Sequence, residues 1–179
     1  MRKRKKTMYN NRQKIQLSYI AGLIDSDGSL SIIKSKTNIP SRIKYKRLKV
    51  KYLYQAWIQI SQIDSQAIQL VKKIFPKYNA YYEIPKKNKR NKFCRIIFTG
   101  QQAYRVAEEI LPYLYIKKQQ AKTILKFRKL NQQRPKLKIK INCQGKYRKF
   151  KAFRYRLSKN QIIQREKLVK EIRNANGTL

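Results

Sequence analysis

The chain contains no histidine, and its 179 residues include only 2 cysteines and 8 acidic residues. Without histidine, nucleophile activation by an imidazole is excluded, and zinc sites of the cysteine and histidine type nearly so. Cys94 lies in a strand-like run and Cys143 in a basic stretch, so we expect no disulfide framework and a reducing compartment. Any hydrolytic chemistry must therefore use carboxylates, amides, lysines and a hard metal cation.

Long apolar runs are also missing. The sequence has no run of about 18 apolar residues that could span a membrane, and no apolar signal core near its start. We therefore expect a soluble chain with no membrane partner. Its length fits one domain with a single hydrophobic core.

Positive charge is present in large excess. Lysine and arginine number 46 against 8 acids, which gives a formal net charge of +38. A solvated surface does not need such an excess, so the charge predicts a polyanionic partner. Composition alone leaves a ribosomal protein, an RNA chaperone and a DNA enzyme open.

The chain divides by composition into three segments. Residues 1–13 form a basic N-terminal arm, residues 14–133 carry the regular hydrophobic patterns of a core, and residues 134–179 form a basic C-terminal segment ending in a helix. The arm reads equally as a solvated tail or as a phosphate-binding segment. The aromatic and basic residues of 147–156 can bind nucleic acid of either kind.

Hydrophobic periodicity predicts alternating helices and strands. Pro40 and Pro76 mark connections, Asp64 or Ser65 can cap one helix, and Ser158 can cap the last. The expected elements are a helix over 14–25, strands from 29 and over 48–61 joined by a basic connection at 37–46, a helix to 75, a hairpin of 80–84 and 93–99, and helices over 100–111, 117–131 and 158–172. This is an α+β chain with the order αββαββα followed by further helices.

The second strand has two unlike faces. Val50, Tyr52, Tyr54, Ala56, Ile58 and Ile60 alternate on one side, which predicts the buried face. The opposite face carries glutamine, tryptophan and lysine, which suit the edges of bases better than water.

The most informative stretch runs from Leu17 to Ser29. Leu17, Ile20 and Ile24 form an apolar helical stripe. A second stripe holds the small residues Ser18, Ala21 and Gly22 together with Asp25 and would let another helix approach closely. Asp25 and Asp27 close the helix and Gly28 stops it. Because acids at a helix C-terminus oppose the helix dipole, they favour a metal-binding role.

This stretch resembles the LAGLIDADG motif, and the chain resembles single-motif LAGLIDADG homing endonucleases. The resemblance implies a saddle-shaped antiparallel sheet, concave toward double-stranded DNA, with helices packed on its back. It also implies a homodimer, in which two motif helices meet across a twofold axis. The stripe of Ser18, Ala21, Gly22 and Asp25 suits that contact.

The resemblance also implies an active site. Asp27 matches the family's metal ligand, and the Ser26 carbonyl matches the backbone ligand before it, with Mg²⁺ as the metal and Mn²⁺ as a substitute. Gln62 matches a polar residue that orients the water network, and Lys117 matches the active-site lysine. Gln66 departs from the pattern, because close relatives carry a basic residue there, and this puts the rate or the water network in question.

Recognition would use the sheet face and the loops. Glutamine can read adenine, arginine can read guanine, and apolar groups can contact the thymine methyl. The expected groove-facing residues are Ser31, Ile33, Ser35, Gln55, Trp57, Gln59, Arg95 and Ile97. Loop cations would hold phosphates without reading sequence, and these are Lys86, Lys87, Lys89 and Arg90.

The sequence thus predicts a Mg²⁺-dependent, site-specific double-strand DNA endonuclease that acts as a homodimer on a long pseudo-palindromic site. An intron-encoded maturase that binds intron RNA is the alternative, and a DNA-binding regulator that does not cleave is the third reading. The many residues with A/T-rich codons suggest an organellar genome, in a chloroplast or mitochondrion, or otherwise a bacterial cytoplasm.

Overall fold

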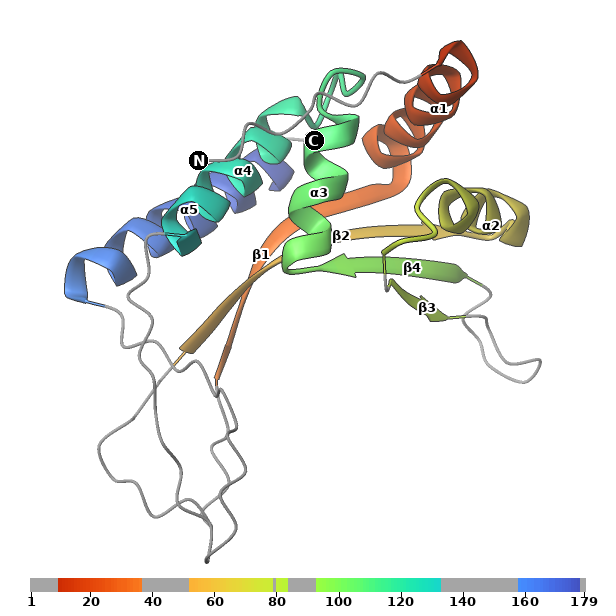
Figure 1. Ribbon diagram of the computed structural model, residues 1–179. Coiled ribbons are helices and arrows are strands. Elements are labelled where there is room, and N and C mark those ends of the chain that lie inside the picture. Colours follow the sequence, from red (N-terminus) through yellow and green to blue (C-terminus); the bar gives the residue numbers. More distant parts are fainter. Residues whose placement is uncertain (1–9, 37–51, 79, 84–92, 133–157, 178–179) are drawn as a thin grey trace, which may run out of the picture.

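The computed structural model describes residues 10–36, 52–78, 80–83, 93–132 and 158–177 (Figure 1). The chain enters through a helix and then alternates two hairpins with helices before it ends in three helices. The elements are α1 (Asn11–Asp27), β1 (Gly28–Lys36), β2 (Tyr52–Gln62), α2 (Ser65–Ile74), β3 (Tyr81–Glu83), β4 (Cys94–Thr99), α3 (Gln101–Ile110), α4 (Lys118–Gln132) and α5 (Lys159–Gly177). The predicted αββαββα order is confirmed.

The described strands form one antiparallel sheet with the order β1-β2-β4-β3. The helices lie over one face of this sheet and leave the other face open (Figure 1). The predicted alternation is confirmed on β2, where Tyr54, Ala56, Ile58 and Ile60 are buried and Tyr52, at the start of the strand, is half-buried. Val50 and the connection 37–46 lie outside the described residues.

The covered face of the sheet and the inner faces of the helices form one hydrophobic core. Leu17, Ile20 and Ile24 bring α1 into it, each at most 2% exposed. Burial of such apolar side chains contributes roughly 1.5–3 kcal/mol each, which makes this core the main source of stability.

Helix ends follow local capping chemistry. Asn10 accepts from the Gln13 backbone N–H at 2.8 Å while the Gln13 side chain accepts from the Asn10 N–H at 3.1 Å. This capping box starts α1 three residues before the predicted Lys14, so that boundary was wrong. Asp64 caps α2 and Ser158 caps α5 as expected.

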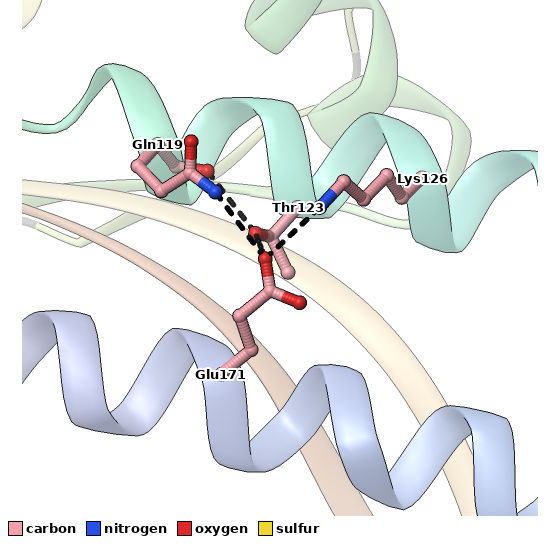
Figure 2. Close-up of polar contacts among 4 residues, drawn as sticks. All are labelled: Gln119, Thr123, Lys126 and Glu171. Atoms are coloured by element: carbon pink, nitrogen blue, oxygen red, sulfur yellow. Dashed lines mark hydrogen bonds and ion pairs between the residues drawn. The ribbon is translucent and has the colours of Figure 1, made fainter.

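α5 continues to Gly177, five residues beyond the predicted end at 172. It packs on α4 and β1 through Leu168, Val169 and Ile172. Figure 2 shows that Glu171 of α5 accepts from Thr123 Oγ1 at 2.8 Å and from Lys126 Nζ at 3.1 Å on α4. These contacts add C-terminal α5 to the core of the domain.

A second junction joins α5 to the sheet. Glu166 accepts a hydrogen bond from the Tyr54 hydroxyl and forms an ion pair with Lys34 at 2.7 Å. Burial and then Glu166 raise the pKa of Tyr54. Burial alone would raise the pKa of Glu166, but Lys34 and Tyr54 outweigh it and lower that pKa.

In the part of the chain that the structure describes, no helix combines the length and apolar character needed to cross a membrane.

Candidate active site and DNA interface

The site begins where α1 runs directly into β1. Gly28 has φ −80 and ψ 161, an extended conformation open to any residue, and its N–H donates to the Ile24 carbonyl. A Cβ at Gly28 would lie 2.6 Å from Ile24 Cα and 2.8 Å from the Ile24 oxygen. Glycine is therefore required here by the close approach of the strand to the last helical turn, and not by a left-handed backbone.

Asp27 and Gln62 meet at this junction. The pairing of Gly28 with Ile60 places the end of β2 beside the end of α1. Gln62 Nε2 then donates to Asp27 Oδ2 at 2.8 Å, across 35 residues of sequence. Asp27 itself is exposed. The amide thus orients a carboxylate that remains accessible from solvent.

Lys117 lies beneath the same turn and is 7% exposed. Its Nζ donates to the carbonyls of Ile24 at 2.8 Å, Gly28 at 2.9 Å and Ser26 at 3.2 Å. Burial lowers the pKa of Lys117, and the charges of Asp25 and Asp27 oppose that shift. All three donors of the ammonium therefore hold the C-terminal end of α1, where a cation also complements the helix dipole.

Asp25 has a different task from Asp27. Its Oδ2 accepts from the Tyr115 N–H at 2.7 Å and its Oδ1 from the Lys117 N–H at 2.8 Å. Both oxygens thus bind backbone amides just before α4, where negative charge is favourable. Asp25 fastens α1 to the loop between α3 and α4.

The donor set fits a hard cation. Asp27 offers a carboxylate and Ser26 a backbone carbonyl, and Mg²⁺ prefers oxygen ligands with only one or two carboxylates. Within the described ranges, no cluster of three or more acidic or cysteine side chains could hold a metal. Asp27 and the Ser26 carbonyl thus offer oxygen atoms of the kind that Mg²⁺ binds, and their role as metal ligands stays a prediction.

The open sheet face carries the expected recognition residues. β1 contributes Ser31, Ile33 and Ser35, and in register opposite them lie Trp57, Gln55 and Leu53 of β2. Gln59 follows two residues after Trp57 and donates to Ser61 Oγ at 3.1 Å. The structure thus gathers these side chains on one polar surface, while contact with bases stays a prediction.

Ile97 is the exception among them. It shares a face with Arg95 on β4, but only 6% of its surface is exposed, and it lies in register between Gln59 and Tyr81. Little of its side chain is therefore accessible in the free chain, and its contact with bases stays a prediction. Sequence alternation gives the face of a residue but not whether its neighbours cover it.

Some expected contacts lie outside the described residues. These are the basic arm up to residue 9, the aromatic and basic tail 134–157, and the loop cations Lys86, Lys87, Lys89 and Arg90.

Gln66, which departs from the motif pattern, is exposed in the first turn of α2 and donates its backbone N–H to Asp64 at 2.8 Å.

The proposed contact face of α1 needs correction at Asp25 and at Ala21. Asp25 is half-buried and uses both carboxylate oxygens to bind backbone amides of its own chain. Ser18 and Gly22 are exposed, but Ala21 is 0% exposed and belongs to this chain's own core. The outward row of small residues is instead Ser18, Gly22 and Ser26, spaced by four. The Ser18 hydroxyl donates to the Lys14 carbonyl at 2.9 Å and the Ser26 hydroxyl to the Gly22 carbonyl at 3.1 Å, which leaves a narrow face with satisfied hydroxyls.

Sequence reasoning missed Glu83. It is the one acid on the open face, opposite Arg95 in the register of β3 and β4, with its Oε2 3.8 Å from Arg95 Nη1. The only signal that could have indicated Glu83 is that an acid is unexpected on the polar sheet face of a basic chain. To use that signal one must know which residues of β3 and β4 lie opposite each other, and the sequence does not specify this pairing.

The fold is similar to that of solved homing endonucleases. The homing endonuclease I-CvuI, solved with the I-CreI target and Mg and with the DNA not cleaved, has a TM-score of 0.65 at 15% identity, covering 93% of this chain and 85% of that one. The archaeal intron-encoded homing endonuclease I-Vdi141I, complexed with DNA, has a TM-score of 0.58 at 12% identity, covering 91% and 85%.

A longer protein also matches. The meganuclease I-SmaMI, bound to uncleavable DNA, has a TM-score of 0.50 at 16% identity, and the match covers 91% of this chain but 44% of that one. No curated protein sequence matches the chain. The sequence model described as LAGLIDADG endonuclease matches residues 20–133. The chain therefore belongs to the LAGLIDADG endonuclease family, whose members are metal-dependent DNA endonucleases.

Proposed function

We propose that this chain is half of a site-specific homing endonuclease that, as a homodimer, hydrolyses one phosphodiester bond in each strand of a long pseudo-palindromic site. The observation that carries this proposal is Asp27, an exposed carboxylate oriented by Gln62 at the end of an open polar sheet face. A chain with a net charge of +38 has no electrostatic reason to aim an acid at a polyanion unless a cation lies between them.

Each residue of the junction has a defined task. Asp27 and the Ser26 carbonyl would hold Mg²⁺, with Mn²⁺ as a substitute. When bound, the metal neutralises phosphate charge and lowers the pKa of the attacking water. Gln62 fixes the orientation of the Asp27 carboxylate. Lys117 acts as a positioning residue, because its ammonium binds the three carbonyls around Ser26 rather than projecting toward solvent.

The sheet would bind the major groove. Its open face carries Gln55, Gln59 and Arg95, whose side chains can donate to base edges, and Trp57, whose Nε1 is buried in the free chain and whose ring would make apolar contacts. Lysines of the surrounding surface would hold phosphates and set the position of the duplex without reading sequence. Such a saddle, doubled by a twofold axis, would cover two half-sites and about 20 base pairs.

The homodimer rests on two observations. The I-SmaMI match covers 44% of that longer chain, so this chain corresponds to about half of it. The outward face of α1 is also narrow, because Ser18, Gly22 and Ser26 have small side chains, and Gly22 lies in open space with nothing of this chain within 4 Å of a Cβ built there. Two such helices could pack closely across a twofold axis and bring the two Asp27 turns together beneath them.

Binding of intron RNA by a maturase remains the alternative. The segments that suggest it, 86–92 and 147–156, lie outside the described residues. The exposed Asp27 favours cleavage, because binding alone does not need an acid that faces phosphate.

The decisive experiment uses two copies of the chain joined by a linker and incubated with the intronless host locus and Mg²⁺. The wild-type fusion should make double-strand breaks. With Asp27→Asn in one copy, it should nick one strand and make few double-strand breaks. With Asp27→Asn in both copies, cleavage should fall by at least roughly 100-fold. Removing a residue that only hydrogen-bonds to a metal ligand can already lower activity by that factor, and Asp27 would be a ligand itself.

Asp64→Asn is the matched control, because it makes the same chemical change at an exposed acid and asparagine caps helices equally well. It should leave cleavage intact. Full cleavage by the double Asp27→Asn fusion, or unchanged double-strand cutting by the single one, would defeat the proposal.

A further inference from the structure

Glu83 is out of place on a DNA-binding surface. All eight acids lie in described segments, and the other seven are elsewhere: Asp25 and Asp27 at the end of α1, Asp64 before α2, Glu108 and Glu109 in α3, and Glu166 and Glu171 in α5. Glu83 alone faces outward from the sheet. A carboxylate there repels the phosphates that the other charges attract, so its presence needs a specific reason.

Stability does not supply that reason. Glu83 Oε2 lies 3.8 Å from Arg95 Nη1, beyond hydrogen-bond distance, and the two side chains are 43% and 38% exposed. An exposed ion pair of this kind contributes little to folding. The contact does, however, hold a donor and an acceptor side by side.

The pair is available for a ligand. Arg95 and Glu83 lie directly opposite each other in the β3–β4 register. Among the described residues, Arg95 Nε is buried and has no hydrogen-bond partner. Because Nε is buried, the donors that a ligand could reach are the terminal Nη groups of this partly exposed side chain, and the Glu83 carboxylate, 3.8 Å from Nη1, accepts no hydrogen bond from it.

A G·C base pair presents the complementary pattern. In the major groove, guanine offers the acceptors N7 and O6, and its cytosine offers the N4 donor beside them. An arginine next to a carboxylate matches this edge, with the donors over guanine and the acceptor over cytosine. No other base pair places two acceptors next to a donor in that order.

We propose that Arg95 and Glu83 together read one G·C pair in each half-site, with Arg95 donating to guanine N7 and O6 and Glu83 accepting from cytosine N4. The inference rests on the proposed DNA-binding function. Arg95 pairs with Ser61, and the next residue of β2 is Gln62, which contacts Asp27. This row is the last of the sheet on the active-site side, so the G·C pair lies toward the cleaved bond.

Rows of the open face are two residues apart, about 6.6 Å, or roughly two base pairs. Each row can therefore be tested separately. The test measures the dissociation constants of the full chain for duplexes that carry each of the four base pairs at every position of a half-site in turn. Wild type should favour G·C at one position on the active-site side by roughly 5- to 150-fold.

Glu83→Met and Arg95→Met should each lose the preference at that same position and keep the others. Glu109→Gln is the matched control for charge, because it also removes one negative charge, and the amide oxygen can still accept from its partner, the Tyr78 hydroxyl. It should keep every preference. Circular dichroism would confirm that each variant is folded.

Two results would overturn the inference. If Glu83→Met keeps the G·C preference while Arg95→Met loses it, arginine reads guanine alone. If neither variant changes any single position although the protein still cleaves one site with Mg²⁺, recognition lies elsewhere and the proposed function stands. A wild-type chain with no sequence preference and no cleavage would instead defeat the proposed function, and this inference with it.

Discussion

Replacing Lys117 with methionine tests whether the buried ammonium serves the fold or the DNA. Methionine keeps the length and apolar stem of the side chain and removes the three donors. The Ile24 carbonyl would retain the Gly28 N–H as a partner, whereas the Ser26 and Gly28 carbonyls would lose the hydrogen bond from the ammonium. Losing a buried partner costs about 1–3 kcal/mol per group, so we expect a loss of about 3 kcal/mol.

For a chain of this size, that loss corresponds to a fall of about 6–12 °C in Tm. Thermal unfolding followed by circular dichroism measures it directly. Lys118→Met, at the adjacent exposed lysine, is the control and should melt like wild type. If Lys117→Met melts within about 2 °C of wild type and cleavage is nevertheless lost, the ammonium acts on the DNA and the positioning role is wrong.

Two further predictions concern the dimer and α5. Gly22→Leu should convert a dimer to a monomer in light scattering and leave the helical signal in circular dichroism unchanged. The single chain has room for a side chain at this position, but a partner helix packed against α1 would leave none. A dimer that persists would place the twofold contact elsewhere. The Thr123 hydroxyl, with Lys126 and Gln119, lowers the pKa of Glu171 below its ordinary 4.5 against the effect of burial. Because the folded pKa is the lower one, this contribution is complete above the unfolded value and is lost as pH falls through the folded value. Glu171→Gln should therefore lower Tm at pH 7 by about 2–4 °C, for a loss of about 1 kcal/mol, and match wild type in acid; a difference that persists undiminished in acid would contradict this assignment.

Periodicity predicted the fold because each helix and strand has one apolar face. Ile20, Ile58 and Ile110 occur at the expected spacings and are all 0% exposed. The boundaries that were wrong depend on single capping contacts, such as the reciprocal bonds of Asn10 and Gln13. The two residues of this capping box, asparagine followed three positions later by glutamine, are visible in the sequence. The basic composition of residues 1–13 nevertheless led to the prediction of an arm there instead of the start of a helix.

The site was less predictable because its contacts join distant segments. Resemblance to the family indicated Asp27, Gln62 and Lys117, and the structure brings all three to one junction. The sequence did not indicate that Lys117 is buried beneath α1, since its neighbours in sequence are exposed. Nor could it show Glu83 opposite Arg95, because that register is set across a hairpin whose connection has no strong turn signal.

Asp25 and Asp27 show why spacing alone does not assign function. Both lie in the last turn of α1, where the helix dipole disfavours negative charge, and Lys117 offsets that cost for both. Asp25 is half-buried and uses both oxygens to bind backbone amides at 2.7 and 2.8 Å, so its charge is committed to the junction with α4. Asp27 is exposed and accepts a hydrogen bond from the Gln62 amide. The structure thus gives Asp25 a role in fixing the turn, whereas Asp27 is the acid that we propose as the metal ligand.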